Sequence, residues 1–404
     1  MAKKKSNRNT STSKNKLRGA PKAHRFSHPF FTPFEARTPI KNVGMRMTDY
    51  VKDNLAKIPA ASGNSVMLLE DIIGVQETAA IKNSKVIRFH AVGDTGHEQG
   101  EAQQAVSDAM AEDYDFSKPD KSPAAFIHLG DVIYYKNTDE GYHAQFYEPY
   151  KKYPGKIIAI PGNHDGEVYS FKGSTGQKKT LDAFKSNFCL PKPSVPPAAG
   201  TIYRQMVNQP GVYWLLKAPF VNIVGLYSNI AEGPGYISGA KTGDVQKKWL
   251  DKTLKNLKAE RDNGDKKALI IAVHHPPLSH GGHSGSTDML KDIDDSCTNA
   301  GIWPDAVLAA HAHNYQRFTR TKNNREVPFI VAGTGGRGIT NVSSATGAVT
   351  GDHTYDVSLK DYGYLLLEVS EKKLVIVFYQ VDHKAGTKQQ FDKVTLDLEG
   401  GKIS

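Results

Sequence analysis

The sequence predicts an α/β protein in which mixed β-sheets are layered with helices. Strand-like and helix-like segments alternate from Val86 onward, and several early strand segments are uninterrupted apolar runs. Such runs are typical of strands that are buried on both faces, as in parallel sheets. The last two strand segments are separated only by residues 370–373 and therefore predict an antiparallel hairpin. Together these observations indicate sheets of mixed strand direction.

Ten segments have the length and apolar content of strands. In chain order they are Val86–Val92, Ala125–Leu129, Lys156–Ile160, Val212–Leu216, Val221–Leu226, Leu269–Val273, Ala306–Ala309, Phe329–Ala332, Tyr364–Val369 and Leu374–Gln380. Apolar residues spaced three and four apart predict helices between them, at 102–110 and at 244–260. No internal repeat interrupts this order.

The composition divides the chain into three parts. Residues 1–25 contain nine basic residues, no acidic one and almost nothing to bury, so we expect a disordered basic tail. Residues 26–85 predict a lead-in segment that wraps the core, with a short helix at 47–58. Residues 86–398 are expected to form the main domain.

The net charge of +10 and the pI of about 9.2 result mainly from the tail, because the rest of the chain carries 43 basic against 42 acidic residues. No apolar run approaches the roughly 18 residues of a membrane span, and no apolar signal segment follows the basic N-terminus. Cys189 and Cys297 define no disulfide framework, and one bridge between them is neither predicted nor excluded. We therefore expect a protein without a membrane span in a reducing, cytoplasmic location.

Five of the expected strands end in residues that are suited to bind ligands. The strand ends are followed by Gly93-Asp94-Thr95-Gly96, Gly130-Asp131-Val132-Ile133-Tyr134, Gly162-Asn163-His164-Asp165, His274-His275-Pro276 and Ala310-His311-Ala312-His313. Each motif alone is typical of an ordinary turn. Ligands bind outside the carboxyl ends of strands in α/β sheets, so five such loops in order predict one shared site.

In this order the motifs resemble those of the calcineurin-like metallophosphoesterases, and in particular the purple acid phosphatase branch. The family pattern consists of GDxG, GDxxY, GNH followed by D or E, a His two residues before Pro, and GHxH. The corresponding motifs in this sequence are GDTG, GDVIY, GNHD, HHP and AHAH. The resemblance covers roughly residues 86–392. It implies a four-layer α/β/β/α sandwich of two mixed β-sheets, the metallophosphoesterase fold, with a two-metal site at its centre. Residues 86–398 would be the catalytic domain.

The resemblance assigns seven metal ligands. The first metal would take Asp94, Tyr134 and His313, the second Asn163, His274 and His311, and Asp131 would bridge the two. Ala310 replaces the Gly that precedes His311 in the family, and we expect little effect because this position supplies no ligand.

Tyr134 takes the place of a ligand that other superfamily members have at the position of Gly96. A free tyrosine has a pKa of about 10, so a phenolate near neutral pH requires a strongly Lewis-acidic ion. The resemblance and this chemistry favour Fe(III) at the Tyr134 site and a divalent ion, Fe, Zn or Mn, at the other. The spacing of His97 matches no family ligand, so we expect it beside the site or in solvent.

The resemblance implies hydrolysis of a phosphate ester by attack of a metal-activated hydroxide, without a covalent intermediate. His164 would face the phosphoryl oxygens as a hydrogen-bond donor or acid, and Asp165 either orients it or caps a turn. The resemblance also favours His283, nine residues after His274, over His280 as the acid for the leaving group. The alternative for either loop histidine is a solvated side chain.

Two arginines are left without an assigned role. Arg317 and Arg337 either contact substrate or pair with carboxylates, while the glycines at 333–336 let the backbone pass close under the metal site. No Gly-Lys-Ser or Gly-Lys-Thr follows these glycines, so they do not form a P-loop.

The leading hypothesis is a phosphomonoesterase of purple acid phosphatase type that acts on a small phosphate ester. A phosphodiesterase for cyclic nucleotides, glycerophosphodiesters or nucleic acid is the alternative, because both reactions use the same two ions. Residues 1–25 also suit nonspecific contact with a polyanion, as in a protein tethered to nucleic acid. Seven intact ligand positions disfavour a non-catalytic scaffold.

Overall fold

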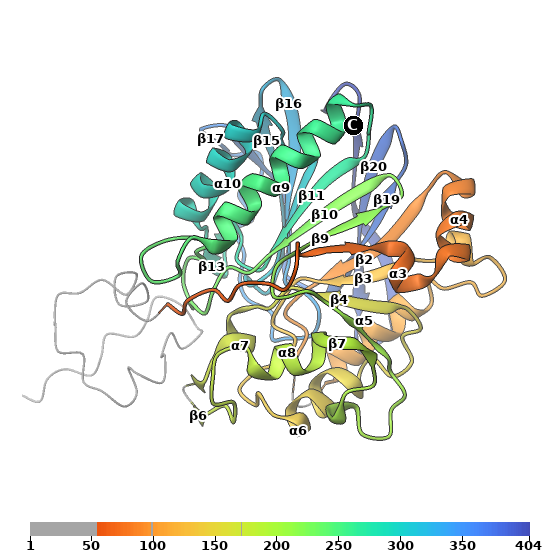
Figure 1. The fold of residues 1–404 in the computed structure, drawn as a ribbon, viewed down its shortest axis with the longest axis vertical. Helices are drawn as coiled ribbons and strands as arrows, with labels where there is room; N and C mark the ends of the chain where they lie inside the picture. The colour runs from red at the N-terminus through yellow and green to blue at the C-terminus, as the bar shows by residue number, and fades with distance from the viewer. Residues whose placement is uncertain (1–54, 98–99, 171) are drawn as a thin grey trace, which may run out of the picture.

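The computed structural model describes residues 55–404, except residues 98, 99 and 171. Its centre is a pair of large β-sheets, of seven and nine strands (Figure 1). The seven-stranded sheet consists, in order, of β22 (Lys402–Ile403), β21 (Thr387–Asp397), β20 (Lys373–Asp382), β19 (Gly363–Val369), β2 (Ile87–Val92), β3 (Ala125–His128) and β4 (Lys156–Ala159). The nine-stranded sheet consists of β1 (Val66–Leu68), β9 (Trp214–Ala218), β10 (Val221–Leu226), β11 (Ala268–Val273), β14 (Ala306–Ala309), β16 (Arg325–Ala332), β15 (Tyr315–Lys322), β18 (His353–Leu359) and β17 (Val349–Thr350).

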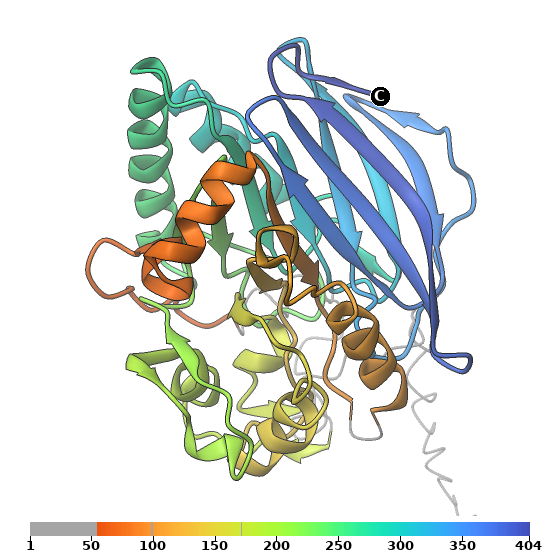
Figure 2. The ribbon, with the colours of Figure 1, turned by 90° about the vertical axis from the view of Figure 1, so that its right-hand side faces the viewer.

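Helices cover the outer face of each sheet, so the predicted four-layer α/β/β/α sandwich is confirmed (Figure 2). Helices α9 (Val245–Asp262) and α10 (Thr287–Ala300) pack on the nine-stranded sheet, where Leu250 and Leu254 of α9 lie in one cluster with Leu269 and Ile271 of β11. Helix α5 (Glu101–Ala111) and the segment around α6 (Asp139–Tyr142) cover the other sheet.

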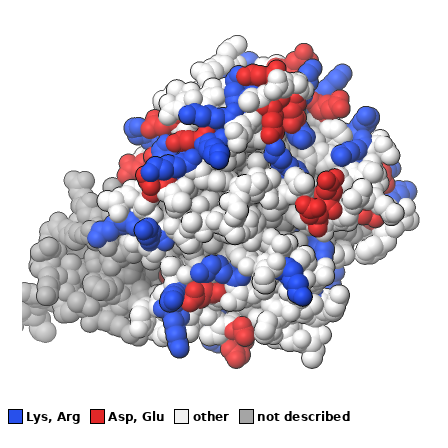
Figure 3. Space-filling model, in the orientation of Figure 1, with Lys and Arg blue, Asp and Glu red and all other residues white. Residues whose placement is uncertain are grey.

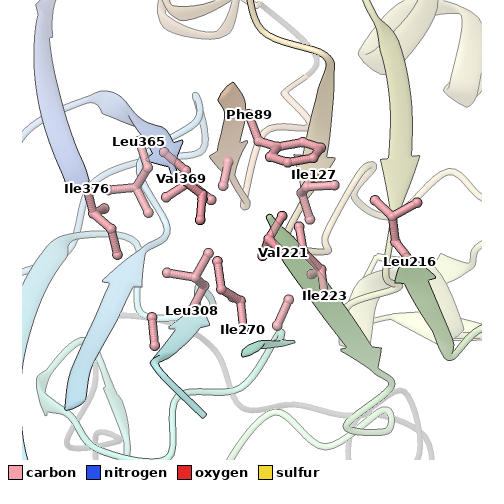
Figure 4. Close-up of a cluster of buried hydrophobic side chains, with 14 of the residues drawn as sticks. Phe89, Ile127, Leu216, Val221, Ile223, Ile270, Leu308, Leu365, Val369 and Ile376 are labelled. Carbon is pink, nitrogen blue, oxygen red and sulfur yellow. The ribbon is translucent and has the colours of Figure 1, made fainter. Parts of the chain in front are cut away.

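The main core lies between the two sheets. Phe89 and Leu365 from the seven-stranded sheet and Ile270 and Leu308 from the other lie in one buried cluster (Figure 4). Burying a side chain of this size contributes about 1.5–3 kcal/mol. This apolar contact therefore holds the facing sides of the two sheets together.

Both sheets combine parallel and antiparallel strands, as the sequence predicts. β2, β3 and β4 run parallel, and so do β10, β11, β14 and β16, whereas β19 and β9 run antiparallel to their neighbours β2 and β10. The expected hairpin is confirmed, because β19 pairs with β20 and Val369 lies opposite Leu374. The carboxyl ends of β2, β3, β4, β11 and β14 carry the five motifs.

The predicted strands differ from the observed ones mainly at their ends. The expected strand at 212–216 begins two residues later as β9, and the one at 329–332 is the second half of β16. Three long strands are additional to the prediction, namely β15, β18 and β21. All three contain many polar side chains, which conceal their pairing.

Residues 55–85 add an edge strand to the nine-stranded sheet and then lead to β2 of the other sheet. β1 pairs in parallel with β9, and α3 (Leu69–Ile73) and α4 (Val75–Ser84) follow. Most of the expected helix at 47–58 lies outside the described residues, and residues 55–58 form neither helix nor strand. The tail of residues 1–25 also lies outside them, so the three-part division of the chain stays a prediction.

Within the described part of the chain, no helix has the length and apolarity that a membrane span requires. Cys189 and Cys297 are both free thiols. On the face shown in Figure 3, Lys and Arg are interspersed with Asp and Glu, as expected for a body that is nearly neutral.

Candidate metal centre

Loops from both sheets bring the seven predicted metal ligands into one buried site. All seven residues have an exposed fraction of 2% or less; they are Asp94, Asp131, Tyr134, Asn163, His274, His311 and His313. Burial at this level is unusual for charged side chains unless they are paired or bind a metal.

Tyr134 lies between two other residues of the expected first metal position. Its hydroxyl donates to Asp94 Oδ1 at 3.0 Å and lies 3.0 Å from His313 Nε2. Ligand atoms of Asp94, Asp131 and His313 lie within 4.8 Å of one another. A single ion can therefore reach this set without a large movement of the chain.

The expected second position lies next to the first and shares Asp131 with it. Ligand atoms of Asp131, His274 and His311 lie within 4.8 Å of one another. His274 Nε2 lies 3.1 Å from Asn163 Oδ1 and 3.4 Å from Asp131 Oδ2. Membership of Asp131 in both groups matches the bridging role expected for it.

The backbone at this site has a left-handed conformation that residues other than glycine rarely adopt. Asp94, Asp131, His311 and His313 all have positive φ angles, of 56°, 53°, 66° and 48°. Left-handed backbone at residues other than glycine costs energy and clusters at functional sites. Four of the seven expected ligands are therefore aimed by turns that the surrounding fold enforces.

Two glycines leave room for this close approach of loops. A Cβ atom at Gly130 would lie 2.7 Å from the backbone nitrogen of Gly162, and one at Gly162 would lie 2.1 Å from Asp131 Oδ1. The side chain of Ala310 occupies the space beside Gly93, and its backbone is not left-handed. Alanine is thus accommodated there, in line with the expectation that this departure has little effect.

Several buried polar atoms at the site have no hydrogen-bond partner among the described residues. They include Asp94 Oδ2, Asp131 Oδ2 and His311 Nε2. An unpartnered buried carboxylate oxygen is costly. Bound cations would satisfy these atoms, so the donor set fits two metal ions.

The electrostatics of the protein keep Tyr134 protonated in the absence of a cation. Burial raises the pKa of Tyr134 well above its ordinary value, and the carboxylates of Asp131 and Asp94 raise it further. Burial also raises the pKa of Asp131, but the positive charges of His274 and His164 outweigh it and hold that pKa well below the usual range.

His164 lies beside the expected ligands and between two acidic side chains. Its Nδ1 is 3.0 Å from Glu167 Oε2, and its Nε2 is 3.7 Å from Glu232 Oε2. Burial lowers the pKa of His164, but Glu167, Asp131 and Glu232 raise it well above its ordinary value. In the absence of bound ions, these carboxylates therefore favour the protonated form of His164.

Neither glutamate was predicted from the sequence to lie at the site. Glu167 follows His164 by three residues, a spacing that brings side chains together on a helical turn. Glu232 lies in the loop after β10 and accepts a hydrogen bond from Asn163 Nδ2 at 2.8 Å, and no local pattern marks it. Asp165 caps the turn rather than orienting His164, because its Oδ2 accepts from the backbone nitrogens of Gly162 and Val132.

Of the loop histidines, His283 lies at the site and His280 does not. The His283 ring is 4.0 Å from that of His311, and its exposed fraction is 4%. His280 instead packs against Tyr355, with ring centroids 4.5 Å apart. His97 accepts a hydrogen bond from the backbone nitrogen of Gly100, and the metal-ligand groups of the described residues do not include it.

The two unassigned arginines differ in their contacts. Arg317 forms ion pairs with Asp392 at 2.7 Å and Asp356 at 2.9 Å, which confirms the structural interpretation for this residue. Pairing with a carboxylate is wrong for Arg337, because no described carboxylate lies within ion-pair distance of its guanidinium. The guanidinium instead lies over the Tyr134 ring, 4.3 Å from its centroid. A Cβ at Gly333 would lie 2.3 Å from Asp94 Oδ2, so this loop does pass under the site.

A family model described as calcineurin-like phosphoesterase matches residues 87–315, a range that contains all five motifs. The chain belongs to this family. Within the family, the Tyr134 hydroxyl beside Asp94 and His313 agrees with the purple acid phosphatase-like branch predicted from the motifs. No curated protein matches the chain.

Three solved structures are similar to this calcineurin-like phosphoesterase. One is GAP50, the anchor in the inner membrane complex of Plasmodium, with 15% identity, a TM-score of 0.48 and coverage of 76% of this chain and 89% of that one. PhoD has 12% identity, a TM-score of 0.46 and coverage of 79% and 71%. A dimetal phosphatase from Danio rerio has 10% identity, a TM-score of 0.44 and coverage of 77% and 99%.

Family membership and the two overlapping ligand groups make the chain a metal-dependent phosphoesterase with a site for two metal ions. It is a hydrolase of phosphoric esters, as the motifs predicted.

Proposed function

We propose that this calcineurin-like phosphoesterase is a phosphomonoesterase of the purple acid phosphatase type. The observation that supports the proposal is the Tyr134 hydroxyl, which lies 3.0 Å from both Asp94 Oδ1 and His313 Nε2. A carboxylate, an imidazole and a phenol then surround one position. Because the pKa of Tyr134 is raised by burial and by two carboxylates, only a strongly Lewis-acidic ion would replace its proton.

The ligand roles follow the order of the motifs. Asp94, Tyr134 and His313 would hold Fe(III). Asn163, His274 and His311 would hold a divalent ion, Fe, Zn or Mn, and Asp131 would contact both ions. When bound, two such ions supply positive charge for the phosphoryl oxygens and make water a better nucleophile near neutral pH.

The side chains beside the ligands would handle the protons. His164 would donate to a phosphoryl oxygen, and Glu167 would hold the imidazolium in place through the contact at 3.0 Å. His283 would give a proton to the departing oxygen of the ester. Its Nδ1 lies 3.1 Å from the backbone oxygen of Glu232, to which an N–H at this nitrogen would donate.

Replacement of Tyr134 with phenylalanine is expected to remove a visible charge-transfer band from the purified protein. The band requires a phenolate bound to Fe(III), and phenylalanine has no oxygen to supply it. Absorption spectra and iron content measured on the same sample check this result. Tyr142, which is also fully buried, provides the control: Tyr142→Phe keeps the band. A colourless wild-type protein that is active with Mn or Zn would refute the iron assignment alone.

The choice between monoesters and diesters is tested with a substrate panel. An aryl phosphate, an alkyl phosphate, a bis-aryl phosphate and a cyclic nucleotide are compared by kcat/KM on one metal-analysed sample. We expect the monoesters to exceed the diesters by at least about tenfold, because His164 favours a dianionic phosphoryl group. Equal or faster diester cleavage would instead support a phosphodiesterase.

Residues 1–25 are proposed as a basic tail outside the catalytic domain, in a protein of a reducing, cytoplasmic compartment. Nonspecific polyanion contact through its nine basic residues is part of this proposal. A chain without these residues is expected to give the same panel result as the full chain.

A further inference from the structure

Three residues from separate loops form a cationic and aromatic group beside the metal centre. Tyr135 follows the expected ligand Tyr134, Lys172 lies between the short strands β5 (Tyr169–Ser170) and β6 (Gly173–Ser174), and Arg337 lies in the loop after β16. Tyr135 is at their centre. The Arg337 guanidinium lies 5.0 Å from the centroid of its ring, and Lys172 Nζ lies 4.7 Å from it.

The position of Tyr135 depends on a strained backbone. Its φ angle is +64°, which is rare for a bulky residue and is typically found at functional sites. The ring lies 5.2 Å from that of His164 and 5.8 Å from that of Tyr134. This conformation therefore places a second aromatic ring next to the residue that we propose to contact the phosphoryl group.

Arg337 offers hydrogen-bond donors that no described residue accepts from. Among the described residues, its side chain makes one hydrogen bond, from Nη2 to the Tyr135 hydroxyl at 2.7 Å. The guanidinium also stacks over the Tyr134 ring at 4.3 Å. Stacking and one hydrogen bond hold the planar fork in place, while Nε and Nη1 donate no hydrogen bond within the described part of the chain. A fork of this kind suits the oxygens of a phosphate.

We propose that Arg337, Lys172 and Tyr135 bind a second phosphate group on the leaving portion of the substrate. The Tyr134 hydroxyl points toward Asp94 and His313, whereas Arg337 lies over the ring. The arginine is therefore beside the centre of reaction and not among its ligands. A bisphosphate would place one phosphoryl group at the metal ions and the other against the two cations. This inference rests on the proposed phosphomonoesterase function and names its substrate class.

The test compares a short alkanediol bisphosphate with the alkyl monophosphate of the same chain length. We expect the wild-type protein to have a kcat/KM about tenfold higher for the bisphosphate, from two charge-assisted contacts. Arg337→Gln is expected to reduce this ratio to about twofold or less, mainly through KM, and Arg337→Lys to restore part of it. Lys172→Gln, at an exposed position, should reduce the ratio by a smaller factor, about twofold to threefold.

The control is Lys255→Gln, which removes an exposed cation from α9 on the outer face of the nine-stranded sheet and should keep the wild-type ratio. A wild-type protein that hydrolyses both substrates equally well, with the same ratio in Arg337→Gln, would overturn the inference and leave the phosphomonoesterase proposal intact. Absence of phosphate release from either substrate would instead contradict the proposed function itself.

Discussion

Replacement of Asp131 with alanine is expected to abolish hydrolysis of an aryl phosphate and to lower the metal content of the protein. Asp131 belongs to both ligand groups, and its Oδ2 is buried without a hydrogen-bond partner among the described residues. Removal of one preorganised electrostatic group typically costs about a hundredfold to a thousandfold in kcat. Loss of the shared carboxylate affects both metal positions, so we expect a loss of at least about a thousandfold.

Two control variants separate loss of metal from loss of the fold. Asp131→Asn keeps the shape of the side chain and should still bind metal poorly. Asp113→Ala removes a partly buried carboxylate that contacts His90, Tyr364 and Lys388 and belongs to none of the ligand groups. The Asp113 variant is expected to unfold at a lower temperature and yet to retain its metal. Full metal content and activity in Asp131→Ala would disprove the shared-ligand assignment.

Replacement of His164 with alanine is expected to lower kcat by about a hundredfold or more while the metal content stays at the wild-type level. Its side chain is 5% exposed and touches Glu167 and Glu232, but the contact with Asp131 Oδ1 comes from its backbone nitrogen at 2.9 Å. Alanine keeps that backbone contact. The loss is therefore expected in the chemical step and not in assembly of the site.

Glu167→Gln distinguishes a positioned cation from a neutral donor at His164. The glutamine keeps the size of the side chain but removes the charge 3.0 Å from His164 Nδ1. We expect an intermediate loss of kcat and a shift of the pH profile, because the pKa of His164 would fall. His280→Ala serves as the control in the loop after β11 and should retain activity. A His164→Ala protein that has lost its metal would show that the residue supports the site instead of the reaction.

The proposed ligands could be picked out from the sequence because their five motifs lie in the loops that follow strands. Asp94 follows β2 and His274 follows β11, and apolar runs mark such strands clearly. Parallel pairing places the carboxyl ends of β2, β3 and β4 together in one sheet and those of β11 and β14 together in the other. The packing of the two sheets against each other then supplies the long-range contacts.

Residues that reach the site from irregular loops could not be predicted in this way. Glu232 is 69 positions away from Asn163, and Arg337 is 202 positions away from Tyr135. No periodic pattern links such pairs, since their contact depends on how the loops pack.

Polar strands could not be predicted either, because their pairing leaves no apolar pattern in the sequence. β21 exposes most of its first seven side chains, so its apolar content is too low to indicate a strand.

The most direct test of the account combines metal analysis with phosphate release on one preparation of the full chain. Metal content is determined by elemental analysis, and inorganic phosphate is measured after incubation with an aryl phosphate. We expect about two ions per chain and a rate of phosphate release that falls in proportion to the metal content as the ions are removed. A folded chain that carries two ions and releases no phosphate from any ester, or one that hydrolyses phosphate esters equally well without metal, would contradict it.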